Sequence, residues 1–197
     1  MMKRIGLSFV ILCVIAALGA CASTPPAKFY TLSPTATPGG ASAGFSVSVG
    51  PVSVPAVIDR PQMVVRVGPN QVAFDEFNRW ASPLPNDISR VVAQNLVSLL
   101  GTPLITVYPD STASGPAYRV GIDVQRFESA PGEEIILDAV WTVRRTKDGQ
   151  VGAGRTTLRE PAADPVYNAI VAAHSRALGR LSGDVAEAIR ALERGNP

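Results

Sequence analysis

Few residues of this sequence are of types that do chemistry, and their spacing does not bring them together. The chain has one histidine, His174, and two cysteines, which leaves no material for a histidine-rich metal site or for a triad with a second histidine. His174 falls on the apolar stripe of an expected helix, where a buried, hydrogen-bonded histidine is much more common than a catalytic base. The sequence contains no nucleophile elbow, zinc-protease motif or phosphate-binding loop. Catalysis therefore leaves few traces in the sequence, and we expect no cofactor.

Adjacent carboxylates, paired glycines and clustered basic residues are the other candidates for ligand binding. Asp75-Glu76 and Glu133-Glu134 have the donor type that hard cations prefer, but neighbouring carboxylates in turns are usually solvated, so we expect no metal. Gly152 and Gly154 lie in a strand pattern and open no helix, which predicts a bulge or a place where Trp141 packs over the backbone. Four basic residues near one expected hairpin tip form either a solvated end or a contact for lipid headgroups or an acidic partner: Arg144, Arg145, Lys147 and Arg155.

The beginning of the chain has the composition of an export signal. Lys3 and Arg4 precede an apolar run over 5–17, which is shorter than the roughly 20 residues that cross a bilayer. The segment Leu18-Gly19-Ala20-Cys21 resembles the lipobox of bacterial lipoproteins, in which the cysteine thiol receives a diacylglyceryl group and the new amino terminus is acylated. We therefore expect a signal peptide over 1–20 and a lipid anchor at Cys21, the alternatives being a signal anchor or a soluble export signal.

A short tether follows the anchor. Residues 21–28 span about 25 Å at roughly 3.3 Å per residue, so the folded domain stays close to its membrane. Ala22 after the cysteine, rather than an aspartate, resembles lipoproteins that are sorted to the outer membrane. We expect the protein on the periplasmic face of the outer membrane, with the inner membrane as the alternative.

The composition excludes two classes of protein. The 197 residues are 46% hydrophobic and 17% charged, with a formal net charge of +2, which excludes an intrinsically disordered chain. The same near-neutral balance excludes a nucleic-acid binder that works by neutralising phosphates. The length and the single set of elements predict one domain over 29–194.

Hydrophobic periodicity predicts an α+β domain. Alternation or short apolar runs predict strands over 29–32, 45–49, 63–67, 71–74, 104–108, 118–125, 135–145 and 151–159. Prolines should confine 52–62 to an edge or a surface loop, and 33–44 should be a flexible loop. We expect a single mixed, largely antiparallel sheet with two main helices packed on one face.

Two helices have clear apolar stripes and start signals. The first should begin at a cap formed by Asn86 or Asp87 and end at Gly101. The second should run over 165–192 with Asp164 as its cap. The stripe residues of the two helices, in chain order, are Ile88, Val91, Val92, Leu96, Leu99, Leu100, Ile170, Val171, His174, Leu178, Leu181, Val185 and Ile189.

Asp148-Gly149 predicts a hairpin with a two-residue turn. That turn would place Trp141 opposite Thr156 and Asp138 opposite Arg159.

Several segments, taken in order, resemble the ABC-type transport auxiliary lipoprotein family, which includes PqiC-like proteins. They are Phe29-Tyr30-Thr31-Leu32 behind the lipobox, 47–55 leading into 58–64, Arg79-Trp80-Ala81-Ser82-Pro83-Leu84, and Ala139-Val140-Trp141. One departure is Ser82, where the family usually has an acidic residue.

The resemblance implies a non-enzymatic outer-membrane subunit of an MCE-linked intermembrane lipid transport system. Such a subunit would dock a periplasmic MCE-domain protein, support envelope integrity and form a homo-oligomer. The alternative is a membrane-anchored module that binds a lipid or another hydrophobic ligand. The candidate residues for partner binding are Asp59, Arg60 and Pro61 in one loop and Arg79 and Trp80 in one turn. They could instead be structural, with an arginine buried against Trp80 and Asp59 as its partner.

Overall fold

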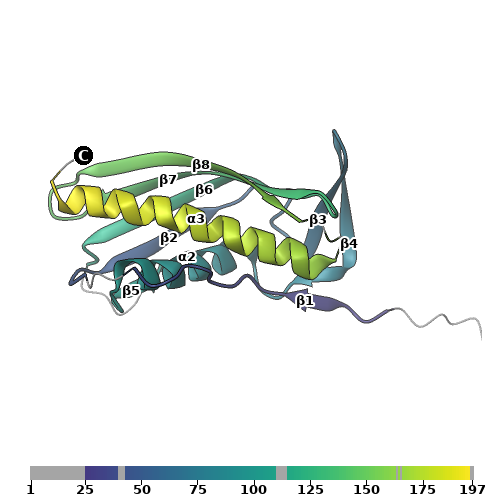
Figure 1. Cartoon of the computed structure of the whole chain (residues 1–197), viewed down its shortest axis with the longest axis horizontal. Helices are drawn as coiled ribbons and strands as arrows, with labels where there is room; N and C mark the ends of the chain where they lie inside the picture. Colours follow the sequence, from purple (N-terminus) through teal and green to yellow (C-terminus); the bar gives the residue numbers. More distant parts are fainter. Residues whose placement is uncertain (1–24, 40–42, 110–114, 163, 165, 196–197) are drawn as a thin grey trace, which may run out of the picture.

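Two β-sheets and two helices make up the part of the chain that the structure describes (Figure 1). The computed structural model describes residues 25–39, 43–109, 115–162, 164 and 166–195. The elements, in chain order, are β1 (Lys28–Tyr30), β2 (Val47–Ser53), β3 (Gln62–Gly68), β4 (Gln71–Trp80), α2 (Leu84–Leu100), β5 (Ile105–Val107), β6 (Tyr118–Ser129), β7 (Glu134–Arg145), β8 (Val151–Pro161) and α3 (Tyr167–Glu193). The expected signal peptide and Cys21 lie outside the described residues, so lipidation stays a prediction.

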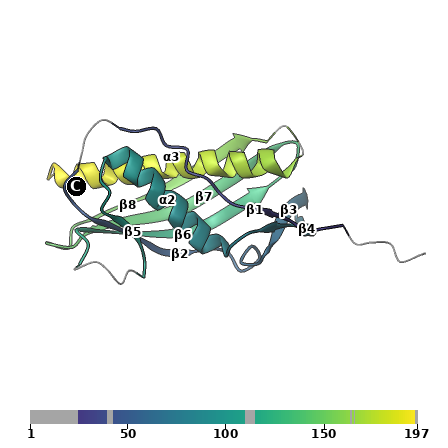
Figure 2. The same ribbon diagram turned by 90° about the horizontal axis from the view of Figure 1, so that it is seen from below.

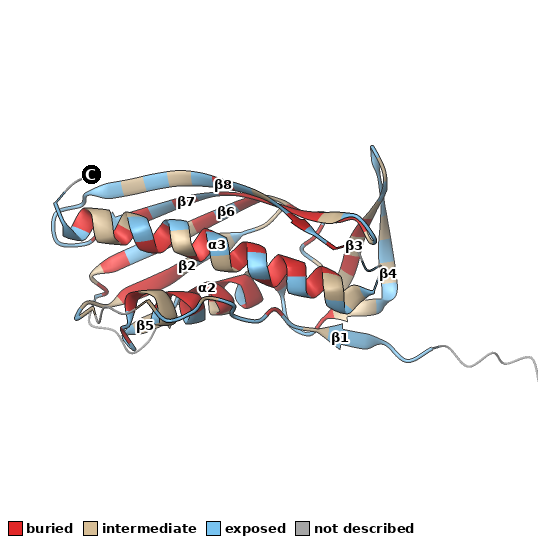
Figure 3. Ribbon diagram, in the orientation of Figure 1, coloured by how far each residue is buried: buried red, intermediate tan, exposed pale blue. Residues whose placement is uncertain are grey.

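The large sheet has the strand order β5-β2-β6-β7-β8, and both helices cover one of its faces (Figures 1 and 2). β6, β7 and β8 pair antiparallel, whereas β2 pairs in parallel with β5 and with β6. The predicted alternation of β6 is confirmed, because Tyr118, Val120, Ile122 and Val124 are all buried. The apolar stripes of both helices are buried in the same core, as Figure 3 shows.

The expectation of a single sheet is wrong, because β1, β4 and β3 form a second, three-stranded sheet. β2 ends at Ser53, and the chain then turns, with Ile58 N donating to Pro55 O at 3.0 Å. The prolines of this loop cannot donate to a ladder, so the next two strands pair with each other instead of extending the large sheet. β1 joins β4 in parallel, so parallel ladders are more frequent among the described strands than the sequence predicted.

The starts of both helices differ from the prediction, and neither helix has a side-chain cap. α2 begins at Leu84 behind Pro83, and the carboxylate of Asp87 lies inside its first turn. That carboxylate accepts a hydrogen bond from Leu32 N at 2.7 Å and is ion-paired with Arg90. α3 begins behind Val166 without a side-chain cap. The predicted end of α2 is confirmed, since Gly101 has the left-handed φ of 65° that terminates a helix.

The β7–β8 hairpin is confirmed, but its register is shifted by two residues. Trp141 faces Gly154 instead of Thr156, and Asp138 faces Thr157. The turn holds four residues rather than two, because Arg145 N donates to Gln150 O at 2.8 Å. A shift by two keeps every side chain on its expected face.

The connector after β1 has no helix or strand in its described residues, but its backbone is bonded to both helices. Thr35 N and Ala36 N donate to Asn95 Oδ1 at 2.9 and 3.0 Å, and Ser33 N donates to Ser175 Oγ at 3.2 Å. In Figure 2 this segment crosses the helix layer. No helix of the described part of the chain is long and apolar enough to cross a membrane.

Candidate functional site

The two segments that hold the predicted site residues meet in the small sheet. Trp80 N donates to Pro61 O at 2.8 Å, and Ala81 N donates to Tyr30 O at 2.8 Å. The 59–61 segment therefore lies against the end of β4, and the turn that follows β4 lies against β1 at the same end of the molecule (Figure 1). A hollow of about 390 Å³ opens between them. Its lining includes four of the five predicted residues, together with neighbours from β1 and the start of α2: Phe29, Asp59, Arg60, Pro61, Trp80, Ala81, Ser82 and Pro83.

Trp80 joins this hollow to the core. Its indole is buried and lies edge-on to Phe127 and His174, with ring centroids 6.2 and 6.5 Å apart. His174 stacks on Phe127 at 3.8 Å, and its Nε2 is 2.9 Å from Ser129 Oγ. Burial lowers the pKa of His174 to about 3, so the ring is neutral at physiological pH. The prediction of a buried structural histidine is confirmed.

The three charged candidates have separate surroundings. Arg79 pairs with Glu76 at 3.2 Å, and the guanidinium of Arg60 lies 4.0 Å from the ring centroid of Phe74. Among the described residues, Asp59 has no ion pair with either arginine. The alternative of a structural arginine that has Asp59 as its ion-pair partner is therefore not found among the described residues. Arg60 Nε is buried without a hydrogen-bond partner in the described structure.

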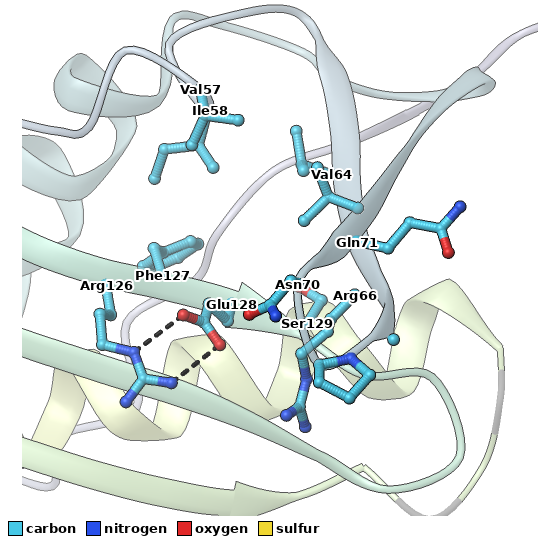
Figure 4. A pocket seen from close by; sticks show the side chains of 13 residues that line it. Val57, Ile58, Val64, Arg66, Asn70, Gln71, Arg126, Phe127, Glu128 and Ser129 are labelled. Atoms are coloured by element: carbon cyan, nitrogen blue, oxygen red, sulfur yellow. Dashed lines mark hydrogen bonds and ion pairs between the residues drawn. The ribbon is translucent and has the colours of Figure 1, made fainter.

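A second hollow, which no motif of the sequence indicated, is lined by the preceding residues Val57 and Ile58. We name it the hairpin groove (Figure 4); it has a volume of about 240 Å³ and lies between the β3–β4 hairpin and β6. Its apolar lining consists of Val57, Ile58, Val64, Val72 and Phe127. Its charged residues are Arg66, Arg126 and Glu128.

The charges at the hairpin groove are fixed by ion pairs. Arg126 and Glu128 form a two-point pair at 2.8 and 2.9 Å, and Arg66 reaches Glu133 at 3.5 Å. The hydrogen bond from Arg126 holds the pKa of Glu128 below its usual value, so the carboxylate stays ionised. The groove therefore has an apolar floor with a charged rim, which is the usual composition of a protein-binding surface.

The small sheet also exposes more apolar surface than a closed core requires. Large apolar side chains with exposed surface lie on all three of its strands: Phe29, Val67, Val72, Phe74 and Phe77. The signal that could have revealed them is the β3–β4 hairpin itself. Its residues are apolar on both faces, since Met63 and Val65 are buried while Val64 and Val72 line the groove. One apolar face of this hairpin packs on the core, and an exposed apolar patch on the other face is typical of an interaction site.

The remaining candidates serve the fold. Arg145 is buried and bonds Leu192 O and Asp148, and Arg155 pairs with Asp138 at 2.6 Å. Arg145 and Arg155 are therefore neutralised by carboxylates of their own hairpin. Trp141 packs over Gly154, as predicted. No cluster of three or more metal-ligating side chains occurs in the described ranges.

Comparison with protein families gives one match over most of the chain. A family profile described as the ABC-type transport auxiliary lipoprotein component matches residues 30–186. No curated protein is similar enough in sequence to count as a match.

Comparison with solved structures supports the same fold. The crystal structure of an uncharacterized protein is 19% identical, with a TM-score of 0.69 over 84% of this chain and 99% of that one. A protein from Xanthomonas campestris assigned to the DUF330 family is 18% identical, with a TM-score of 0.68 over 85% and 99%. A PelC dodecamer from Paraburkholderia phytofirmans is 13% identical over 75% and 93%, and its TM-score of 0.40 is too low to support an argument.

Proposed function

Because this chain belongs to the ABC-type transport auxiliary lipoprotein family, we propose that it is a non-enzymatic docking subunit of an MCE-linked lipid transport system. In this proposal the lipid at Cys21 holds the domain on the periplasmic face of the outer membrane. The hairpin groove then binds a segment of a periplasmic MCE-domain protein, and PqiC-like subunits provide the analogy. The chain would hold its partner at the membrane and would catalyse no reaction.

The hairpin groove is the observation that carries this proposal. Its apolar floor excludes water from a bound segment, and its three charged side chains are held by ion pairs before any partner arrives. A preformed surface of this kind loses little side-chain entropy on binding, which favours affinity. Val57 and Val72 leave about half of their side-chain surface exposed at the groove, so this surface is available to a second protein.

The polar groups of the core support a role without catalysis. His174 is enclosed by Phe127, Trp80 and Ser129, and its depressed pKa keeps it neutral. The space between the large sheet and the helices is filled by buried side chains, which gives the alternative of a lipid held between these layers no specific support.

Affinity purification at native expression level tests the proposal. The change is Val72→Lys, which places a cation beside Arg66 in the groove. Like charges and a lost apolar contact should disrupt binding of the partner, so detergent extracts should yield an MCE-domain protein with the wild type and much less with the variant. The matched control is Val151→Lys, an equally exposed valine at the start of β8, which should behave as wild type. Equal recovery from both variants would place the partner elsewhere, and no MCE-domain protein with the wild type would refute the proposed function.

A further inference from the structure

Phe29 is placed unusually for an aromatic side chain. It is 64% exposed, the most exposed large apolar side chain in the described part of the chain. It lines the hollow of about 390 Å³ together with Pro61, Ala81 and Pro83, all of which are exposed at the surface. We name these four residues the Phe29 patch. Trp80, which is buried, also lines the hollow.

The Phe29 patch is held rigidly. Phe29 is the central residue of β1 and is aligned with Arg79 of β4. Its neighbour Tyr30 accepts a hydrogen bond at its carbonyl from Ala81 N, donates its hydroxyl to Asn78 at 2.9 Å, and lies against the ring of Tyr167. An exposed phenylalanine in a fixed strand is not a frayed terminus. It is a preorganised apolar surface that lacks a partner in the isolated chain.

The length of the tether determines what this surface can reach. Seven residues lie between Cys21 and Phe29, so the eight steps from one to the other span at most about 26 Å at roughly 3.3 Å per residue. A domain of this length has a radius of gyration of roughly 15 Å, so its far end lies farther from the anchor than the patch does. The C-terminal end, with the start of β8, is at the opposite end of the molecule (Figure 1). The anchored chain thus keeps the Phe29 patch closer to the bilayer than the exposed apolar side chains at the opposite end of the molecule.

We propose that the Phe29 patch inserts into the headgroup and upper acyl region of the bilayer that holds the lipid anchor. This inference rests on the lipidation part of the proposed function but not on the partner. Lys28 is exposed beside Phe29 and provides a cation for lipid phosphates. The acyl chains and the patch then contact the membrane at two points of one domain. Two contacts fix the orientation of the domain, whereas a flexible tether alone would not.

A thiol reporter on the full lipidated chain tests this contact without any partner. Cys13 leaves with the signal peptide and acylation blocks Cys21, so Phe29→Cys carries the single reactive thiol of the mature protein. The protein is labelled with an environment-sensitive fluorophore and inserted into vesicles of phosphatidylethanolamine and phosphatidylglycerol, some containing lipids with a nitroxide high on the acyl chain. The matched control is Val151→Cys, also exposed and on a strand, but at the opposite end.

The expected result is a blue-shifted emission and strong nitroxide quenching at position 29, with neither at position 151. A second reporter at Ala81→Cys should be quenched in the same way, and adding Phe29→Asp should abolish that quenching while the fold is retained. Equal quenching at positions 29 and 151 would overturn the proposal. A blue shift without quenching would also overturn it, since protein and not lipid would then cover the patch. Two labelled thiols would show that Cys21 is not acylated. A mass measurement therefore distinguishes missing lipidation from a patch that does not enter the bilayer.

Discussion

The burial of His174 could be predicted from the sequence, but its contacts could not. Its position on an apolar stripe predicted burial, and the structure confirms it. Its stacking on Phe127 and its bond to Ser129 depend on where β6 lies relative to α3, which no spacing in the sequence determines. The same is true of Asp87, whose position predicted a helix cap but whose carboxylate bonds the backbone of Leu32.

The depressed pKa of His174 predicts acid sensitivity. The pKa is about 6.5 in an unfolded chain and about 3 in the fold, so between these values only the unfolded state binds the proton. The free energy of unfolding should therefore fall by about 1.4 kcal/mol for each pH unit below about 6.5. Asp75, Glu128 and Asp138 also have lowered pKa values, and they add to the loss only nearer their own range.

Urea unfolding of the wild type and His174→Gln between about pH 7 and about pH 5 measures this effect. The variant should show almost no slope in that window. Parallel slopes for the two proteins would contradict the assignment of the acid sensitivity to His174.

Gly154 and Gly183 should respond to alanine in opposite directions. A Cβ at Gly154 would lie 2.4 Å from Cζ2 of Trp141, whose ring is fixed by its hydrogen bond to Thr156. Gly154→Ala should therefore destabilise the fold by about 1–3 kcal/mol. Gly183 faces open space on α3, so Gly183→Ala should stabilise it by about 0.5–1 kcal/mol. Thermal unfolding checks both, and equal shifts of the same sign would argue against this packing.

At the scale of elements, periodicity was a reliable guide to which segments form strands and helices, and a poor guide to how they pair. The β7–β8 hairpin has the expected strands, but a four-residue turn moved its register. The division into two sheets was missed because β3 and β4 have ordinary strand patterns, and only the loop before them separates them from the large sheet. The hairpin groove follows from that division, so it could not be predicted either.

Asn95 links three segments and gives a prediction at this scale. Its Oδ1 accepts from Thr35 N and Ala36 N, and its Nδ2 donates to Ser182 Oγ at 3.3 Å. Asn95→Ala leaves two partly buried backbone donors without an acceptor, which should cost about 1–3 kcal/mol and release residues 35 and 36 from α2.

Hydrogen exchange at the amides of residues 35 and 36 should accelerate strongly in Asn95→Ala. Ser98→Ala serves as the control, because Ser98 lies on the same helix and bonds the connector only through its backbone carbonyl. Unchanged exchange in Asn95→Ala would mean that the connector is held by other contacts.

At the scale of the whole molecule, the two hollows divide the small-sheet end into two surfaces. The Phe29 patch is next to the tether, and the hairpin groove lies between the β3–β4 hairpin and β6. Four of the five candidate residues from the sequence lie at the first surface, because Trp80 N bonds Pro61 O and β4 pairs with β1. If the patch faces lipid, the domain has one orientation on the membrane and presents its groove at a fixed position. A partner that spans the periplasm would then bind a domain whose orientation on the membrane is fixed.

The intact mass of the protein, purified in detergent from its own membrane, tests this account most directly. The account predicts a chain that begins at Cys21 and carries a diacylglyceryl group on its sulfur and a fatty acid on its amino terminus. Cys21→Ser should leave the mass without lipid and the protein outside the membrane fraction. An unmodified thiol at position 21, or a retained leader, would contradict the account.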